Sequence, residues 1–95
     1  MTAAYLIDGM LSGTGVRDAI NGGYPAPRDI GLSKALTDEV TDWQRRYEEA
    51  HFDGFPEDLV AELDQQGLDL AAQAGIELPD IEIGYFSNWQ LKRLS

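Results

Sequence analysis

The chain has 95 residues, with seven Lys and Arg against 17 Asp and Glu, a formal net charge of −10 and no cysteine. These numbers fit one small domain over residues 1–95 and exclude disulfides, thiolate metal sites and a cysteine nucleophile. The acidic balance argues against direct binding of nucleic acid or of an anionic membrane, because both need Lys and Arg to neutralise phosphate. With a single histidine as well, we expect no metal and no cofactor.

The sequence contains no apolar run near the roughly 20 residues of a membrane span. Its first residues do not have the basic start and apolar core of a signal peptide. We therefore expect a soluble, cytoplasmic protein.

The N-terminal third is expected to hold a strand over 4–7, rich in aromatic and branched residues, followed by a glycine-rich segment over 9–31. A loop of that length is unusual in a small domain, which favours a short element inside it. Thr14 as an N-cap, with Val16 and Ile20 four residues apart on one face, predicts about one and a half turns of helix there.

Two longer helices are expected next. Apolar residues at steps of four and three predict a helix over 34–51, with Trp43 and Tyr47 in its buried face. Pro56 followed by two acids is typical of a second helix start, and Gly75 is expected to end that helix. The short connection between the two helices favours a helical hairpin.

The C-terminal part is expected to return to strand. Strict alternation over 80–85 predicts a half-buried strand whose Ile81, Ile83 and Tyr85 face the core, and a further short strand is expected over 89–94. Together these elements predict an α+β domain, in which a small sheet of two or three strands is covered by a two-helix hairpin. The short extra helix lies in the glycine-rich N-terminal third.

The acidic charge is concentrated in the second half of the chain. Residues 1–31 have a net charge of −1 and residues 32–82 a net charge of −11, while the last Lys and Arg add +2. No Lys or Arg occurs from residue 47 to residue 91, an interval that holds eleven acids. The charge therefore marks a region of the molecule rather than the whole surface.

Asp58, Glu62 and Asp69 lie on one side of the second helix, because steps of four and seven return to the same face. Like charges at such spacing slightly disfavour a helix, so solvation of an acidic protein explains this face only in part. We hypothesise that it docks on a basic surface of a partner protein and there imitates a nucleic acid. The same surface is expected to include further acids and apolar anchors, namely Glu48, Glu49, Asp53, Phe52, Phe55 and Trp89.

Two other hypotheses stay open. One is a small ligand-binding or enzymatic domain that uses the glycine-rich loop over 9–15, although Asp18 stands where a dinucleotide motif needs its third glycine. The other is a self-associating structural subunit, such as a homodimer, in which a second copy covers apolar residues that a two-layer fold leaves exposed. The candidate ligand-binding residues of the loop are Asp8, Ser12, Thr14 and Arg17.

A family resemblance is carried by segments spread over residues 29–86. These segments are Asp29-Ile30-Gly31-Leu32-Ser33, Trp43 with Tyr47-Glu48, Gly67-Leu68-Asp69-Leu70-Ala71, Glu77-Leu78-Pro79 and Tyr85-Phe86. Their order resembles that of small, uncharacterised acidic bacterial proteins, some of which are associated with toxin–immunity loci. The resemblance implies a bacterial neutralising or accessory protein, and it brings no catalytic residues with it. Together with the acidic helix face, it leads to our first hypothesis, a non-enzymatic inhibitor or immunity-type protein.

Overall fold

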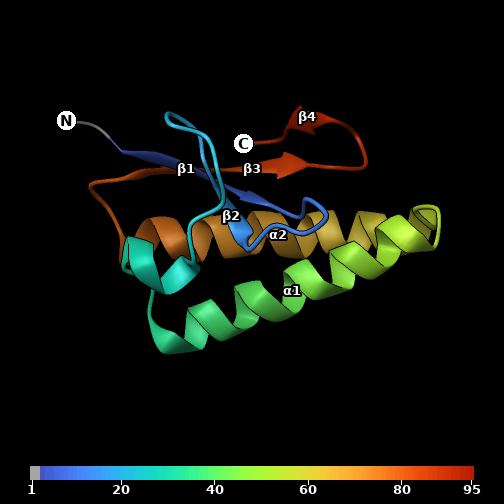
Figure 1. The fold of residues 1–95 in the computed structure, drawn as a ribbon, viewed down its shortest axis with the longest axis horizontal. Helices are drawn as coiled ribbons and strands as arrows, with labels where there is room; N and C mark the ends of the chain where they lie inside the picture. Colours follow the sequence, from blue (N-terminus) through green and yellow to red (C-terminus); the bar gives the residue numbers. More distant parts are fainter. Residues whose placement is uncertain (1–2) are drawn as a thin grey trace.

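Four strands and two long helices form two layers in the computed structural model, which describes residues 3–95 (Figure 1). The strands are β1 (Ala4–Asp8), β2 (Gly15–Asp18), β3 (Glu82–Ser87) and β4 (Lys92–Arg93), in the sheet order β2-β1-β3-β4. The helices are α1 (Lys34–Phe52) and α2 (Glu57–Glu77), preceded by a 3-10 helix, η1 (Pro27–Ile30). The predicted α+β class is confirmed, and the sheet has one strand more than expected.

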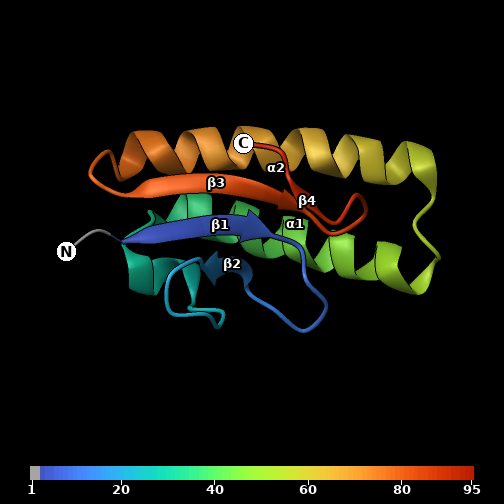
Figure 2. The ribbon, with the colours of Figure 1, turned by 90° about the horizontal axis from the view of Figure 1, so that it is seen from above.

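The central strand β1 pairs antiparallel with β2 and parallel with β3. Because parallel strands need a crossover connection, α1 and α2 lie between β1 and β3 in the chain and cover one face of the sheet (Figure 2). Ile7 stands opposite Val16 on β2 and Tyr85 on β3, and all three side chains are fully buried. This row forms the sheet side of the core.

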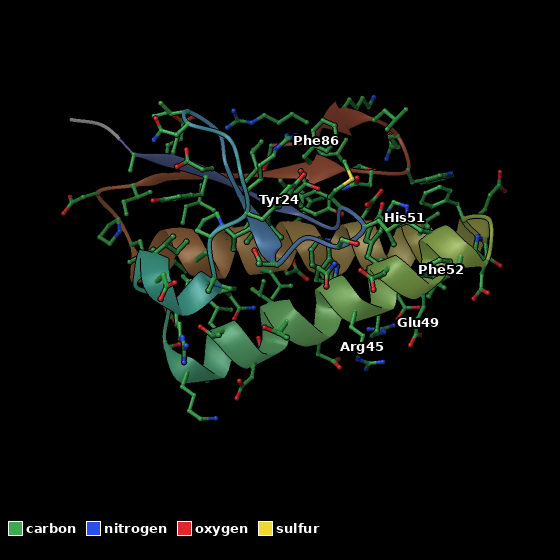
Figure 3. All side chains as sticks on the ribbon, viewed as in Figure 1. Tyr24, Arg45, Glu49, His51, Phe52 and Phe86 are labelled. Atoms are coloured by element: carbon green, nitrogen blue, oxygen red, sulfur yellow. The ribbon has the colours of Figure 1, made fainter. Side chains whose placement is uncertain are left out.

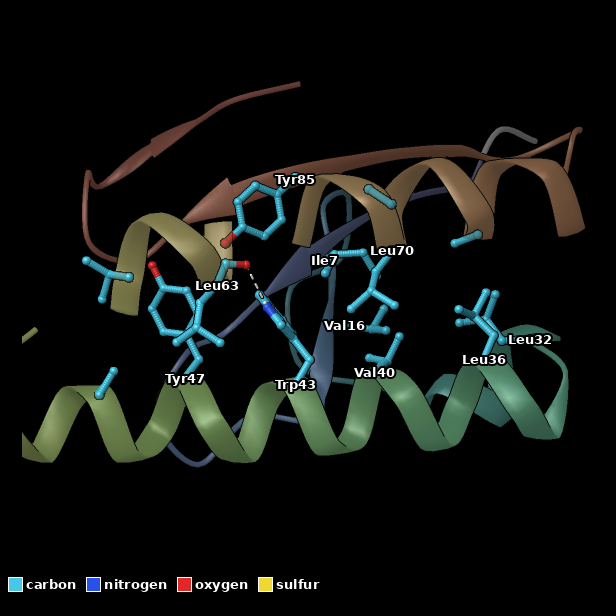
Figure 4. Packing of buried hydrophobic residues seen from close by; sticks show 14 residues of the cluster. Ile7, Val16, Leu32, Leu36, Val40, Trp43, Tyr47, Leu63, Leu70 and Tyr85 are labelled. Atoms are coloured by element: carbon cyan, nitrogen blue, oxygen red, sulfur yellow. Dashed lines mark hydrogen bonds between the residues drawn. The ribbon is translucent and has the colours of Figure 1, made fainter. Parts of the chain in front are cut away.

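The helix side of the core follows the predicted periodicity of α1, whose Trp43 and Tyr47 are buried. The indole of Trp43 packs edge-on against Tyr47 and Tyr85, with ring centroids 5.5 and 5.7 Å apart. Its Nε1 donates to the carbonyl oxygen of Leu63 at 2.8 Å, which joins α1 to α2 (Figure 4). Gly67 lets α2 approach β3, because a Cβ at this position would lie only 2.0 Å from the Tyr85 ring.

The predicted short helix after Thr14 is wrong, since Gly15–Asp18 form strand β2. Val16 is fully buried against the core, whereas Ile20 is 58% exposed in the following turn. The Thr14 hydroxyl donates to the carbonyl oxygen of Pro25 at 2.7 Å instead of capping a helix. Pairing with β1 supplies the backbone hydrogen bonds that so short a helix supplies poorly. The short helix of this region is η1, farther along the chain.

Three other boundaries differ from expectation. Gly75 lies inside α2, which continues to Glu77 and ends at Leu78, because a residue before proline is disfavoured in helical conformation. Strand β3 begins at Glu82, so Ile81 precedes it and is half-buried. The last strand, β4, covers only Lys92–Arg93, because residues 88–91 form the turn that leads to it.

No helix within residues 3–95 is long and apolar enough to cross a membrane.

Candidate functional site

Helix α2 carries six acids and no Lys or Arg, and five of these carboxylates are exposed. Three of them, Asp58, Glu62 and Asp69, form what we call the acidic row. Glu62 lies 3.9 Å from Arg46 of α1, and Asp69 lines a groove that α1 also lines, so the acidic row lies on the side of α2 that adjoins α1. The sequence had indicated a row without any basic neighbour. Arg46 reaches it from α1 and also donates to Gln66 at 2.9 Å.

A groove of about 290 Å³ lies between α1 and α2, and we call it the helix groove. Its lining is apolar at Trp43 and Leu70, acidic at Glu39, Asp42 and Asp69, and otherwise formed by Arg46, Gln66 and Gln73. Trp43 and Leu70 are 3% and 6% exposed, so they form the bottom of the groove. Three carboxylates against one guanidinium leave the walls with an excess of negative charge.

The three flanking acids predicted for the docking surface differ in their exposure and in their hydrogen-bond partners. Glu48 is half-buried and accepts the backbone N–H of Ser12 at 2.9 Å, so it fastens the glycine-rich loop to α1. Glu49 is exposed and pairs with Arg45 at 3.0 Å, one helical turn away (Figure 3). Asp53 is exposed at the C-cap of α1. Of these three flanking acids, only Glu49 and Asp53 therefore present their carboxylates to solvent.

The three predicted apolar anchors also differ from one another. Phe52 is 76% exposed at the end of α1 (Figure 3). Phe55 is half-buried and packs edge-on against His51, with ring centroids 4.7 Å apart. Trp89 is half-buried against the core, and its backbone N–H donates to the Tyr47 hydroxyl at 3.1 Å. Phe52 is thus the anchor whose ring is free for a partner, whereas the other two belong largely to the core.

The candidate residues of the glycine-rich loop do not converge on one pocket. Asp8 is fully buried, and its Oδ2 lies 3.1 Å from Nε of Arg17, close enough for an ion pair but not aligned for a hydrogen bond. The Arg17 guanidinium lies over the ring of Phe86, 4.7 Å from its centroid. Ser12 and Thr14 instead bond to Glu48 and Pro25 and hold the loop in place.

A buried carboxylate on α2 was not among the predicted site residues, but Asp64 is only 4% exposed. The hydroxyls of Tyr47 and Ser87 donate to it at 2.9 and 2.8 Å, and the Tyr85 hydroxyl donates to the same oxygen as Tyr47. We call these four residues the carboxylate network. Burial, reinforced by the hydrogen bond to Asp64, raises the pKa of Tyr85, and burial raises the pKa of Tyr47 to about 12.

The carboxylate network joins the layers, because its members come from α1, α2 and β3. Three hydroxyl donors take the place of water around the Asp64 carboxylate. The one sequence signal for it is position: Asp64 lies four residues after Val60 and three before Gly67, within the buried stripe of α2. An acid in such a stripe indicates a buried polar cluster, although not its partners.

No protein-family model and no curated protein matches this chain. Within residues 3–95, no three His, Cys, Asp or Glu side chains converge so as to hold a metal ion. His51, the single histidine, lies 3.2 Å from the carbonyl oxygen of Gly9 and packs against Phe55. The acidic row and the helix groove are therefore the features from which a function is best argued.

Proposed function

We propose that the protein is a cytoplasmic, non-enzymatic inhibitor or immunity-type protein that binds a basic surface of a partner protein. The acidic row and the helix groove form the docking surface, and Glu49, Asp53 and Phe52 extend it at the end of α1. In this role the surface imitates the charge of a nucleic acid and occupies the site that the partner uses for one.

The observation that carries this proposal is the charge of α2. Five exposed carboxylates on one helix without a Lys or Arg repel one another, and the helix dipole favours only the two in the first turn, Glu57 and Asp58. Glu77 has a structural use, because it accepts the N–H and hydroxyl of Ser33 at the start of α1. Stability thus accounts for the acids at the two ends of α2, and in part for Glu62 through its 3.9 Å pair with Arg46, while Asp69 remains for recognition.

Complementary charge fits such recognition because it steers association and selects the partner, whereas apolar contacts supply most of the affinity. Phe52 can supply such an apolar contact, since 76% of its surface is exposed. Solvation of an acidic protein needs neither an acidic row beside a groove nor an exposed ring at the end of α1. The presence of the acidic row, the helix groove and an exposed Phe52 together therefore favours a docking surface.

Neutralising the acidic row is expected to weaken partner binding about tenfold to 100-fold at low salt. The variant combines Asp58→Asn, Glu62→Gln and Asp69→Asn, which keep side-chain size while removing three charges from exposed positions. The partner is captured from the host on the immobilised chain, identified by mass spectrometry and purified. Its affinity for each variant is then measured by calorimetry at two salt concentrations.

A matched control combines Asp29→Asn, Asp80→Asn and Glu82→Gln, which remove the same charge from exposed positions outside α1 and α2. This control is expected to keep affinity within about threefold of the wild type. Equal losses in the two variants would reduce the effect to net charge and contradict the proposal. Duplex DNA is expected to compete with the chain for the partner, and binding indifferent to DNA would reject the nucleic-acid imitation.

A further inference from the structure

We propose that the helix groove binds an arginine side chain of the partner protein, an assignment that rests on the proposed function and gives it a specific contact. The occupant follows from three features of the groove: its preformed shape, its apolar bottom and the placing of its charges.

The bottom of the groove is held rigidly. Trp43 is fixed by its hydrogen bond to Leu63 and by edge-on packing on Tyr47 and Tyr85. Leu70 belongs to the same buried cluster. Both residues are nearly inaccessible in total, and the groove has a volume of about 290 Å³ in the chain as folded. A side chain that enters it has little protein reorganisation to overcome.

The walls carry carboxylates from both helices, Glu39 and Asp42 from α1 and Asp69 from α2. Asp42 accepts a hydrogen bond from Arg45 through Oδ1 at 2.7 Å, which leaves its second oxygen for another donor. The one cation in the lining, Arg46, donates to Gln66 and lies 3.9 Å from Glu62. Its charge is therefore offset by an acid outside the groove lining, and the groove keeps an attraction for a cation.

An arginine side chain matches this arrangement better than other cationic groups. Its three methylenes can pack on the small parts of Leu70 and Trp43 that reach the groove, while its head group stays among the carboxylates. The planar guanidinium offers five N–H donors in a fork that fits carboxylates on two sides, whereas a lysine ammonium is a more strongly hydrated point charge. A metal ion would not use the apolar bottom. The partner therefore presents an arginine at the centre of its basic surface.

The test is an NMR titration of the full-length, ¹⁵N-labelled chain with the peptide acetyl-Gly-Arg-Gly-amide. We expect saturable shifts of the Asp69, Leu70 and Gln73 amides and of the Trp43 indole N–H, because these four residues line the groove. Replacing arginine by citrulline keeps the shape and removes the charge, and should weaken binding at least about tenfold. The lysine peptide should bind at least about threefold more weakly than the arginine peptide.

Gln73→Trp fills the groove without changing charge, and Gln65→Trp adds the same ring to an exposed position of α2 outside the groove. Gln73→Trp is expected to weaken arginine-peptide binding at least about tenfold, while Gln65→Trp leaves it unchanged. Equal shifts by the arginine and citrulline peptides, or shifts spread over all exposed acids, would overturn the assignment.

The outcomes also separate this inference from the proposed function. If the groove does not respond to the arginine peptide while the neutralised acidic row still loses the partner, the groove assignment is wrong and the docking surface stands. If the groove binds the peptide but the neutralised row and Gln73→Trp both keep full affinity for the partner, the partner is not the source of the arginine and the proposed function fails with it.

Discussion

Replacing Asp64 with alanine is expected to lower the free energy of unfolding by about 3 kcal/mol or more. The carboxylate accepts hydrogen bonds from the Tyr47, Tyr85 and Ser87 hydroxyls, and all four side chains are buried. The substitution leaves three buried donors without an acceptor, each at a cost of about 1 to 3 kcal/mol. Because domains of this kind are stable by only about 5 to 15 kcal/mol, such a loss is a large share of the total.

Urea unfolding followed by circular dichroism measures this loss, and Asp69→Ala is the matched control. Asp69 lies on the same helix and carries the same charge, but it is exposed, so its loss should stay within about 0.5 kcal/mol. Equal stability of the two variants would mean that burial of the Asp64 charge cancels what the three hydroxyls contribute. The carboxylate network would then not stabilise the contact between the layers.

Raising the pH from about 10 to about 12 is expected to remove about 2 kcal/mol of stability through Tyr47 alone. Its pKa is raised in the folded chain to about 12, chiefly by burial, whereas in the unfolded chain it stays near 10. The folded state therefore holds a proton that the unfolded state has lost across this range. Stability is fully present below about pH 10 and falls as the pH rises, and Tyr85 adds to the fall because its pKa is also raised.

The free energy of unfolding in urea, measured at intervals between about pH 8 and pH 12, follows this dependence. Tyr47→Phe removes one of the two buried titrating hydroxyls next to Asp64, so its stability should start lower and fall less steeply. A stability that is constant up to about pH 12 in the wild-type chain would show that the tyrosines of the carboxylate network do not titrate abnormally.

The helical part of the fold could be predicted because its signals are local. The buried face of α1 depends only on the helical period, which places Val40, Trp43 and Tyr47 on one side. Strand β2 could not be predicted in the same way, because Val16 becomes part of a strand only through its pairing with β1. The spacing between Val16 and Ile20 was compatible with a helix, but tertiary pairing decided the outcome.

The same difference between local signals and tertiary contacts decides which parts of the candidate site could be predicted. The acidic row could be predicted, since three acids on one face of a helix depend on spacing alone. The helix groove could not, because Trp43 and Leu70 come together only when α1 packs on α2. The carboxylate network likewise joins Asp64 to residues of another helix and of β3, and sequence spacing does not contain such contacts.

The core and the proposed docking surface lie on different sides of the helical layer. The side facing the sheet holds the core and the carboxylate network, while the acidic row and the walls of the helix groove reach solvent. Substitutions in the acidic row therefore change charge without removing buried contacts. This separation makes the docking surface testable without unfolding the domain.

NMR cross-saturation from the unlabelled, purified partner to the labelled chain tests the docking surface most directly. We expect the amides that lose intensity to lie on the solvent side of α1 and α2, around Asp42, Glu62 and Asp69, and to include Phe52 at the end of α1. Saturation confined to the other face of the sheet, around Arg17 and Phe86, would contradict the acidic docking surface.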